Sequence, residues 1–83
     1  MDIAMEQASL TDLVRETENR LAEVDRQIGL QQEVIEKLLA TKQDTGRAIE
    51  LLGDFHELRE MLQTHKDRLL AALERTEEPS SQA

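Results

Sequence analysis

The chain lacks cysteine and has almost no aromatic residues. Without cysteine there is no disulfide framework, no zinc–thiolate site and no thiolate nucleophile. Phe55 is the only aromatic residue and Pro79 the only proline. No stretch approaches the roughly 18 apolar residues of a membrane span. The start, Met1 to Glu6, is acidic and lacks the apolar run of a secretory signal. We therefore expect a cytoplasmic protein.

Positive charge is also scarce. Asp and Glu outnumber Lys and Arg by 18 to 10, which gives a formal net charge of −8. Nucleic acids and anionic membrane surfaces are both bound through cationic side chains. The charge balance therefore argues against either as a partner.

What the chain does contain is helix formers. Its 83 residues allow one small domain, and Leu, Glu, Gln, Arg and Ala dominate it. Residues 1–8 carry no strong pattern and are expected to be flexible. Ser9 is a candidate N-cap with Asp12 three residues later, a variant of the capping box. From about residue 10 to 42 we predict a helix whose apolar seam repeats every three and four residues. The seam comprises Leu10, Val14, Thr17, Leu21, Val24, Ile28, Gln31, Ile35 and Leu38.

The pattern stops at Lys42–Gly46, and a second one begins. Asp44 or Thr45 can cap a new helix, because each offers a side-chain oxygen to an unpaired N–H group. We predict a turn at about 43–45, which with Gly46 reverses the chain, and a helix from about 46 to 77. Pro79 ends the helical pattern, and 79–83 are expected to form a disordered tail. The second seam comprises Ala48, Leu51, Phe55, Leu58, Leu62, His65, Leu69 and Ala72.

The two seams match in one antiparallel register, which pairs Leu38 with Ala48 at one end and Val14 with Ala72 at the other. That register places Glu18 beside Lys66 and Asp25 beside Arg59, although it also brings Arg20 near Arg68. We predict an all-α, antiparallel helical hairpin in preference to one continuous helix. Its predicted core comprises Leu21, Val24, Ile28, Ile35, Leu38, Leu51, Phe55, Leu58, Leu62 and Leu69.

A family resemblance agrees with this hairpin. From Ala22 to Leu73 the chain resembles a group of short α-proteobacterial helical proteins, notably of rhizobia, that have no assigned activity. The resemblance implies two helices joined by a Gly-x-Asp-Thr turn. This chain lacks the turn glycine near Gln43 and has Arg47 where an acidic residue is usual. The shared residues are Asp44-Thr45, Ala48, Leu51-Leu52, Phe55, Leu58, Leu62, His65 and Arg68-Leu69-Leu70.

Residues capable of chemistry are few. His65 on the seam is interpreted as a core histidine, with a pH switch as the alternative. His56 and Glu60 are spaced to share a metal, but two ligands do not make a site. Carboxylates fall on solvated faces, where nothing shifts their pKa values toward catalysis. We predict a non-catalytic protein without cofactor or metal.

The chain has more apolar residues than its two seams use. Residues beside the two seams are more hydrophobic than a two-stranded hairpin requires, and small scaffolds often need oligomerisation. We therefore predict a homodimer that forms a four-helix bundle and serves oligomerisation or protein interaction. The alternative is a small adaptor or regulator whose apolar flank binds a helix of another protein. The predicted interface comprises Leu13, Val34 and Met61 on one side and Leu39, Leu52 and Leu73 on the other.

Overall fold

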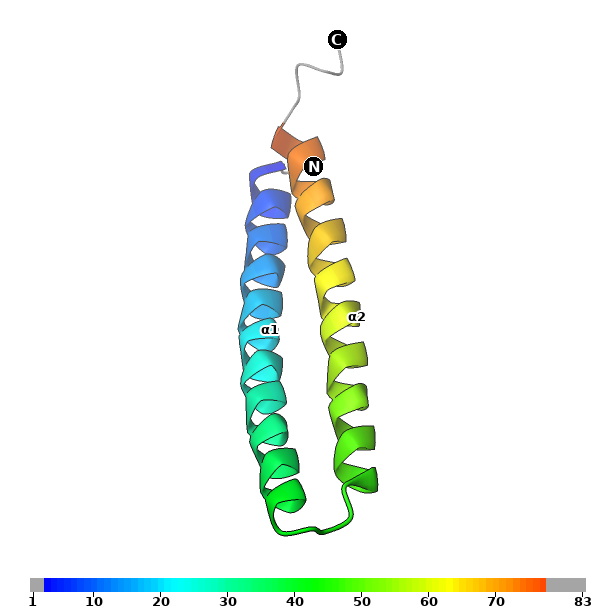
Figure 1. Ribbon diagram of the computed structural model, residues 1–83. Helices are drawn as coiled ribbons and strands as arrows, with labels where there is room; N and C mark the ends of the chain where they lie inside the picture. Colours follow the sequence, from blue (N-terminus) through cyan, green and yellow to red (C-terminus); the bar gives the residue numbers. More distant parts are fainter. Residues whose placement is uncertain (1–2, 78–83) are drawn as a thin grey trace.

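The computed structural model describes residues 3–77 and shows two long antiparallel helices (Figure 1). Helix α1 runs from Ile3 to Ala40 and α2 from Gly46 to Glu77. The rod measures 65 × 17 × 15 Å along its principal axes. The predicted all-α hairpin is confirmed.

The first helix begins earlier than the sequence predicts. Its start was expected near residue 10 after a Ser9 cap, but Ser9 lies inside α1. The segment before it contains Ala, Met, Glu and Gln, and neither Gly nor Pro, so intrinsic propensity carries the helix through a potential cap. The helix ends at Ala40, before the predicted residue 42, whereas α2 has the predicted bounds. The predicted tail, 79–83, lies outside the described residues.

The end of α1 has the hydrogen bonds of a Schellman motif. The backbone N–H of Gln43 donates to the carbonyl of Leu38 at 2.8 Å, and that of Lys42 to the carbonyl of Leu39 at 3.1 Å. Lys42 has a φ of 56°, in the left-handed region that usually favours glycine. The chain therefore turns without the glycine that the family resemblance implies, because Lys42 adopts the left-handed conformation that usually favours glycine.

Helix α2 is capped by the two residues that precede it. The Thr45 carbonyl accepts from the N–H of Ile49 at 2.9 Å, which places Thr45 at the N-cap position. The Asp44 carboxylate accepts from the N–H of Gly46 at 3.0 Å. Asp44 thus supplies the capping oxygen from one position before the N-cap. The connection spans 41–45 rather than 43–45.

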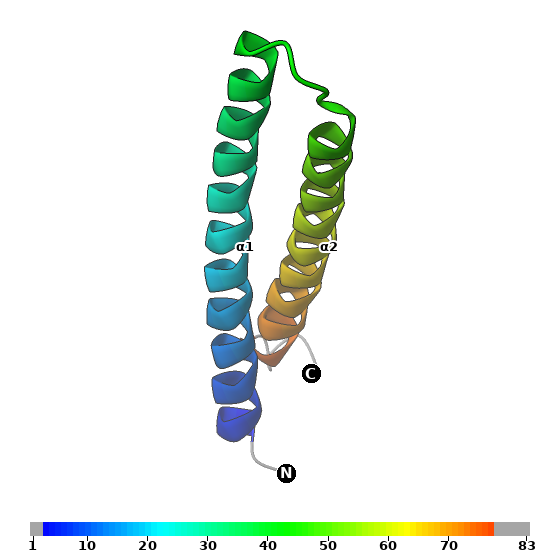
Figure 2. The same ribbon diagram turned by 90° about the horizontal axis from the view of Figure 1, so that it is seen from below.

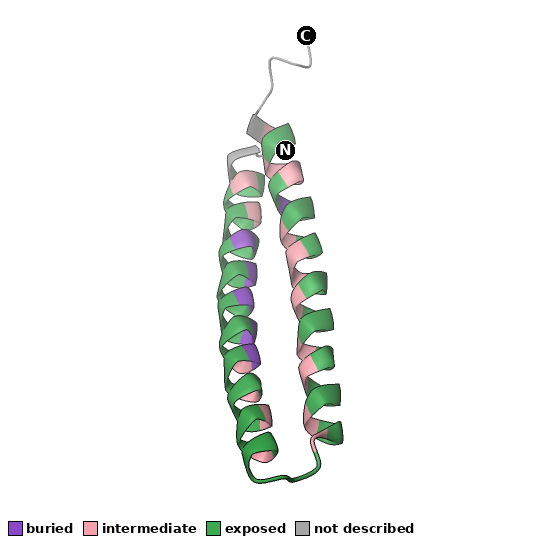
Figure 3. Ribbon diagram, in the orientation of Figure 1, coloured by how far each residue is buried: buried purple, intermediate pink, exposed green. Residues whose placement is uncertain are grey.

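The core lies in the half of the hairpin away from the connection. Buried residues gather there (Figure 3), and the helices diverge toward the connection (Figure 2). Thr17 is buried, and its hydroxyl donates to the Leu13 carbonyl at 2.7 Å. In the less buried half, the Gln31 amide donates to the Ala48 carbonyl at 3.0 Å and links the two helices. The buried apolar residues are Val14, Leu21, Val24, Ile28 and Leu69.

Helix α2 turns a different face to α1 than its hydrophobic pattern predicts. Leu51, Leu58 and His65 were assigned to the seam, but all three are exposed. Arg59 and Lys66 lie further toward α1 and form ion pairs, at 2.6 Å with Asp25 and at 3.2 Å with Glu18. The less exposed residues again repeat at three and four residues. The repeat comprises Ala48, Leu52, Phe55, Arg59, Leu62, Lys66, Leu69 and Leu73, and Gln63, Ala71, Ala72 and Thr76 are also half-buried.

Candidate interaction surface

The two long flanks of the hairpin differ in chemistry. The predicted ion pairs, Asp25 with Arg59 and Glu18 with Lys66, bridge the helices along one side, which we call the ion-paired flank. The Lys66 side chain is only 24% exposed there, so its aliphatic stem covers the boundary between the helices. On this flank the hairpin's own side chains therefore cover the boundary between the two helices.

The opposite side, the open flank, contains a groove. Part of it is lined by Leu13, Glu16, Thr17 and Arg20 of α1 together with Leu62 and His65 of α2. The adjoining part passes over α2, where Leu58, Met61 and Arg68 join the lining. Arg20, Leu62 and His65 border both parts, so the groove is continuous.

Exposed apolar side chains concentrate on the open flank. Val34 follows Leu13 by three heptads and Leu30 follows Glu16 by two, so all four lie on that side of α1. Leu51 precedes Leu58 by one heptad on α2. The flank holds six of the ten large hydrophobic residues that are exposed in the described chain. The six are Leu13, Leu30, Val34, Leu51, Leu58 and Met61.

Charges on the open flank are only partly neutralised within the chain. Arg20 pairs with Glu16 at 2.8 Å. By contrast the side chains of Arg68, Asp54 and Glu57 take part in no hydrogen bond or ion pair among the described residues. Charges of both signs occur in each part of the flank, since Glu57 lines the groove together with Arg68, and Arg47 lies beside Asp54. The flank therefore combines apolar side chains with charges of both signs along its length.

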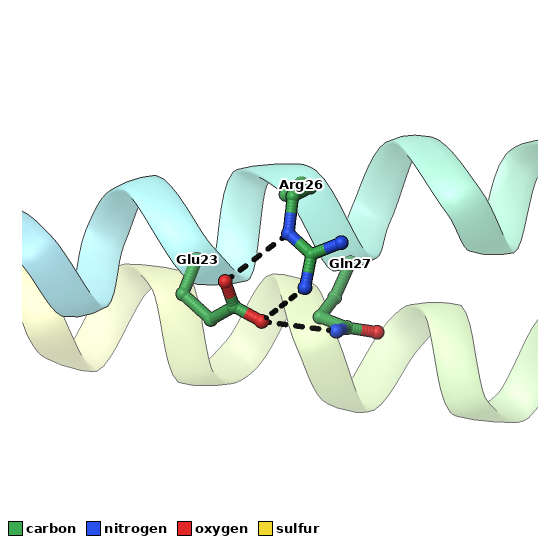
Figure 4. A network of polar contacts seen from close by, with 3 residues as sticks. All are labelled: Glu23, Arg26 and Gln27. Atoms are coloured by element: carbon green, nitrogen blue, oxygen red, sulfur yellow. Dashed lines mark hydrogen bonds and ion pairs between the residues drawn. The ribbon is translucent and has the colours of Figure 1, made fainter.

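One polar network lies on this flank of α1 (Figure 4), because Glu23 follows Glu16 by one heptad and Gln27 precedes Val34 by one. The Glu23 carboxylate accepts two hydrogen bonds from Arg26, at 2.7 and 3.1 Å, and one from Gln27 at 3.1 Å. The bonds from Arg26, and then that from Gln27, lower the pKa of Glu23, and Glu23 in turn raises the pKa of Arg26. These groups pair with one another within a single helix, and as exposed contacts they contribute little to stability.

The predicted interface residues divide by side. Leu13, Val34 and Met61 are exposed on the open flank, and Met61 is 69% exposed. On the other side Leu39 is exposed near the connection, whereas Leu52 and Leu73 are half-buried on the face of α2 turned toward α1. The rotation of α2 thus leaves the side with Leu13, Val34 and Met61 exposed. It buries Leu52 and Leu73 partly against α1.

The predicted core divides in a similar way. Leu21, Val24, Ile28 and Leu69 are buried, while Ile35, Leu38, Phe55 and Leu62 are half-buried. Leu51 and Leu58 are 43% and 42% exposed, so their assignment to the hairpin core is corrected. The signal that was missed is the pairing of two cations of α2, Arg59 and Lys66, with carboxylates of α1. It was used to set the register but not the rotation of α2.

Other kinds of site have little support. Within residues 3–77, no group of three or more His, Asp or Glu side chains is arranged to hold a metal ion. His56 and Glu60 are both exposed. Over the same residues, neither helix contains a segment apolar enough to cross a bilayer.

No protein-family model, curated protein or solved structure matches this chain. Its function is therefore inferred from its own surface.

Proposed function

We propose that this chain is a non-catalytic oligomerisation module in which two hairpins pack through their open flanks into a four-helix bundle. The observation that carries the proposal is the gathering of six exposed apolar side chains on one flank. Contiguous apolar surface on a small soluble protein marks an interaction site more often than scattered hydrophobic residues do.

The weakness of the isolated hairpin supports the same proposal. None of its described side chains is fully buried, because each helix has only one neighbour to pack against. Two-helix scaffolds of this size gain stability by burying the remaining apolar surface in an oligomer. A second hairpin on the open flank would cover residues such as Leu58 and Met61 and complete the core.

Net charge opposes the association of two copies. Each hairpin carries a formal charge of −8, so the copies repel at long range. At a salt concentration of 0.1 M, this repulsion is largely screened beyond a distance of about 10 Å. Apolar burial must therefore drive the dimer, and added salt should strengthen it.

The test uses two lysine substitutions on opposite flanks of α2. Met61→Lys places a charge on the open flank, where a second copy would desolvate it without a partner. Ile49→Lys makes the same charge change on the ion-paired flank, at a residue that is 53% exposed. We expect sedimentation equilibrium to find a dimer at micromolar concentration for the parent and for Ile49→Lys, and a monomer for Met61→Lys.

Circular dichroism accompanies each measurement, since Met61 is exposed enough for the hairpin itself to tolerate lysine. A Met61→Lys dimer of unchanged mass would contradict this interface. A well-folded parent that remains monomeric at high micromolar concentration would overturn self-association. The open flank would then be assigned to a helix of another protein, as in an adaptor.

A further inference from the structure

We infer that the second copy docks on the half of the open flank next to the connection, and that this half of the hairpin becomes fully packed only in the dimer. The inference rests on the proposed dimer and adds the place of contact and its effect on the fold. The contact surface, which we call the connection patch, comprises Leu30, Val34, Leu51, Leu58 and Met61.

Packing within the hairpin is weakest beside the connection. All buried residues of the described chain lie at 14–28 and at 69, and along 29–68 no residue is buried. The two helices also diverge toward the connection (Figure 2). Each half consists of two helices with one neighbour each, so this divergence accounts for the difference in burial. The seam residues nearest the connection are only half-buried, and they are Gln31, Ile35, Leu38, Ala48, Leu52 and Phe55.

Exposed apolar side chains gather on the same half of the open flank. Four members of the connection patch lie between residues 30 and 58, on both sides of the connection, and Met61 lies at the middle of α2. Of the six exposed large hydrophobic residues on the flank, only Leu13 lies outside the patch. The surplus of apolar surface and the shortage of internal packing therefore coincide.

The other half of the open flank is less suited to burial. At the positions nearest the boundary between the helices it carries Arg20 and His65. One heptad toward the connection, Gln27 and Leu58 take these places. Arg20 and His65 also line the groove together with Arg68. A second copy laid over the groove would remove both arginines from water, and apolar contacts offset that cost poorly.

A second copy fits the connection patch in area and in charge. Half of one face of a rod 65 Å long and 17 Å wide is about 550 Å², so two identical patches would bury about 1,100 Å², just above the roughly 1,000 Å² that a specific interface needs. A two-fold axis buries both patches at once. The charges beside Leu51 are of both signs, since they belong to Arg47, Glu50 and Asp54. The surface therefore does not select a partner with a strong charge of one sign.

The test compares two leucines of α1 that lie on the same flank and are equally exposed. Leu30 and Leu13 are both 44% exposed, but only Leu30 belongs to the connection patch. Lysine at either position changes the net charge equally, and at position 30 the second copy would desolvate it without a partner. We expect sedimentation equilibrium to give a dissociation constant at least about 100-fold above that of the parent for Leu30→Lys, and within about threefold of the parent for Leu13→Lys.

The two variants separate the place of contact from the existence of the dimer. Circular dichroism should show that both keep the helix content of the parent, because both positions are exposed. If Leu13→Lys weakens the dimer as much as Leu30→Lys, or if Leu30→Lys leaves it intact, the place of contact is wrong and the proposed function stands. A parent that remains monomeric at high micromolar concentration would overturn both.

Hydrogen exchange tests the effect of docking on the fold in the unsubstituted chain. Backbone amides open most readily where few apolar contacts hold a helix. In the parent diluted well below its dissociation constant, we expect the amides of 31–40 and 50–58 to exchange at least about tenfold faster than those of 17–28. Well above the dissociation constant this difference should narrow. Equal exchange in the two halves of the monomer, or a difference that the dimer leaves unchanged, would overturn the inference that docking completes the packing of this half.

Discussion

Lys42 is the residue at which a single substitution should stabilise the hairpin most directly. It lies two residues beyond the end of α1 with a φ of 56°, a left-handed conformation that brings a β-carbon close to the following carbonyl oxygen. Two backbone hydrogen bonds, from Lys42 to Leu39 and from Gln43 to Leu38, hold it there. Lys42→Gly removes the β-carbon and retains both bonds.

The expected gain follows from two opposing terms. A left-handed residue other than glycine costs about 1–2 kcal/mol, and glycine relieves that cost. Glycine also loses more backbone entropy on folding, which lowers the free energy of unfolding by about 0.4–1 kcal/mol. The net expectation is about 0.5–1 kcal/mol of added stability, or a rise in Tm of roughly 2–8 °C for a domain of this size.

The assay is thermal and urea unfolding, followed by circular dichroism at one fixed protein concentration so that self-association contributes equally. Lys42→Ala is the matched control, because it removes the charge and the stem but keeps the β-carbon. Its stability should lie within a few tenths of a kcal/mol of the parent. If Lys42→Gly is neutral or destabilising, or if Lys42→Ala stabilises as much, the left-handed residue is not what limits the turn.

Four other substitution sites follow from the same structure. Gly29→Ala and Gly53→Ala should each add about 1 kcal/mol in thermal unfolding, because both lie within helices and an added β-carbon meets nothing within 4 Å; a loss of stability would place that glycine against another chain. Phe55→Ala should cost about 1.5–2.5 kcal/mol in urea unfolding, roughly half the cost at a fully buried site, because Phe55 is half-buried; a loss below 1 kcal/mol would mean that its ring lies on the surface. An NMR titration should find the pKa of Glu23 below its ordinary value, and Arg26→Gln should raise it. The small stabilisation from this network should be full above the ordinary Glu pKa and lost as pH falls through the folded-state value; an unchanged pKa in Arg26→Gln would refute the assignment.

The register of the hairpin was predictable because several independent signals depend on it. The reversal near Asp44, the two heptad seams and the charge pairs of Glu18 with Lys66 and Asp25 with Arg59 all require the same alignment, and the structure contains both ion pairs. The start of α1 was not predictable from its cap. Ser9 is a good N-cap only if the preceding residues leave the helix, and those residues are helix formers.

The rotation of α2 was mispredicted for a different reason. Hydrophobicity alone prefers the face with Leu51 and Leu58 to the neighbouring face with Arg59 and Lys66. Long cationic side chains nevertheless pack at a helix boundary, because their aliphatic stems cover apolar surface while their charged groups reach outward. The carboxylates of α1 lie where those groups emerge, so the charged face turns inward. A pattern that scores Arg and Lys only as polar cannot distinguish the two rotations.

This rotation links the stability of the hairpin to its proposed interface. Turning Arg59 and Lys66 toward Asp25 and Glu18 closes one flank, and the same turn carries Leu51, Leu58 and Met61 to the other. If α2 turned the predicted face to α1, Leu51 and Leu58 would be buried in the hairpin core. The ion pairs are partly exposed and weak individually, but they determine which apolar side chains of α2 stay exposed. Their principal effect is therefore on which apolar surface the hairpin exposes rather than on how firmly it folds.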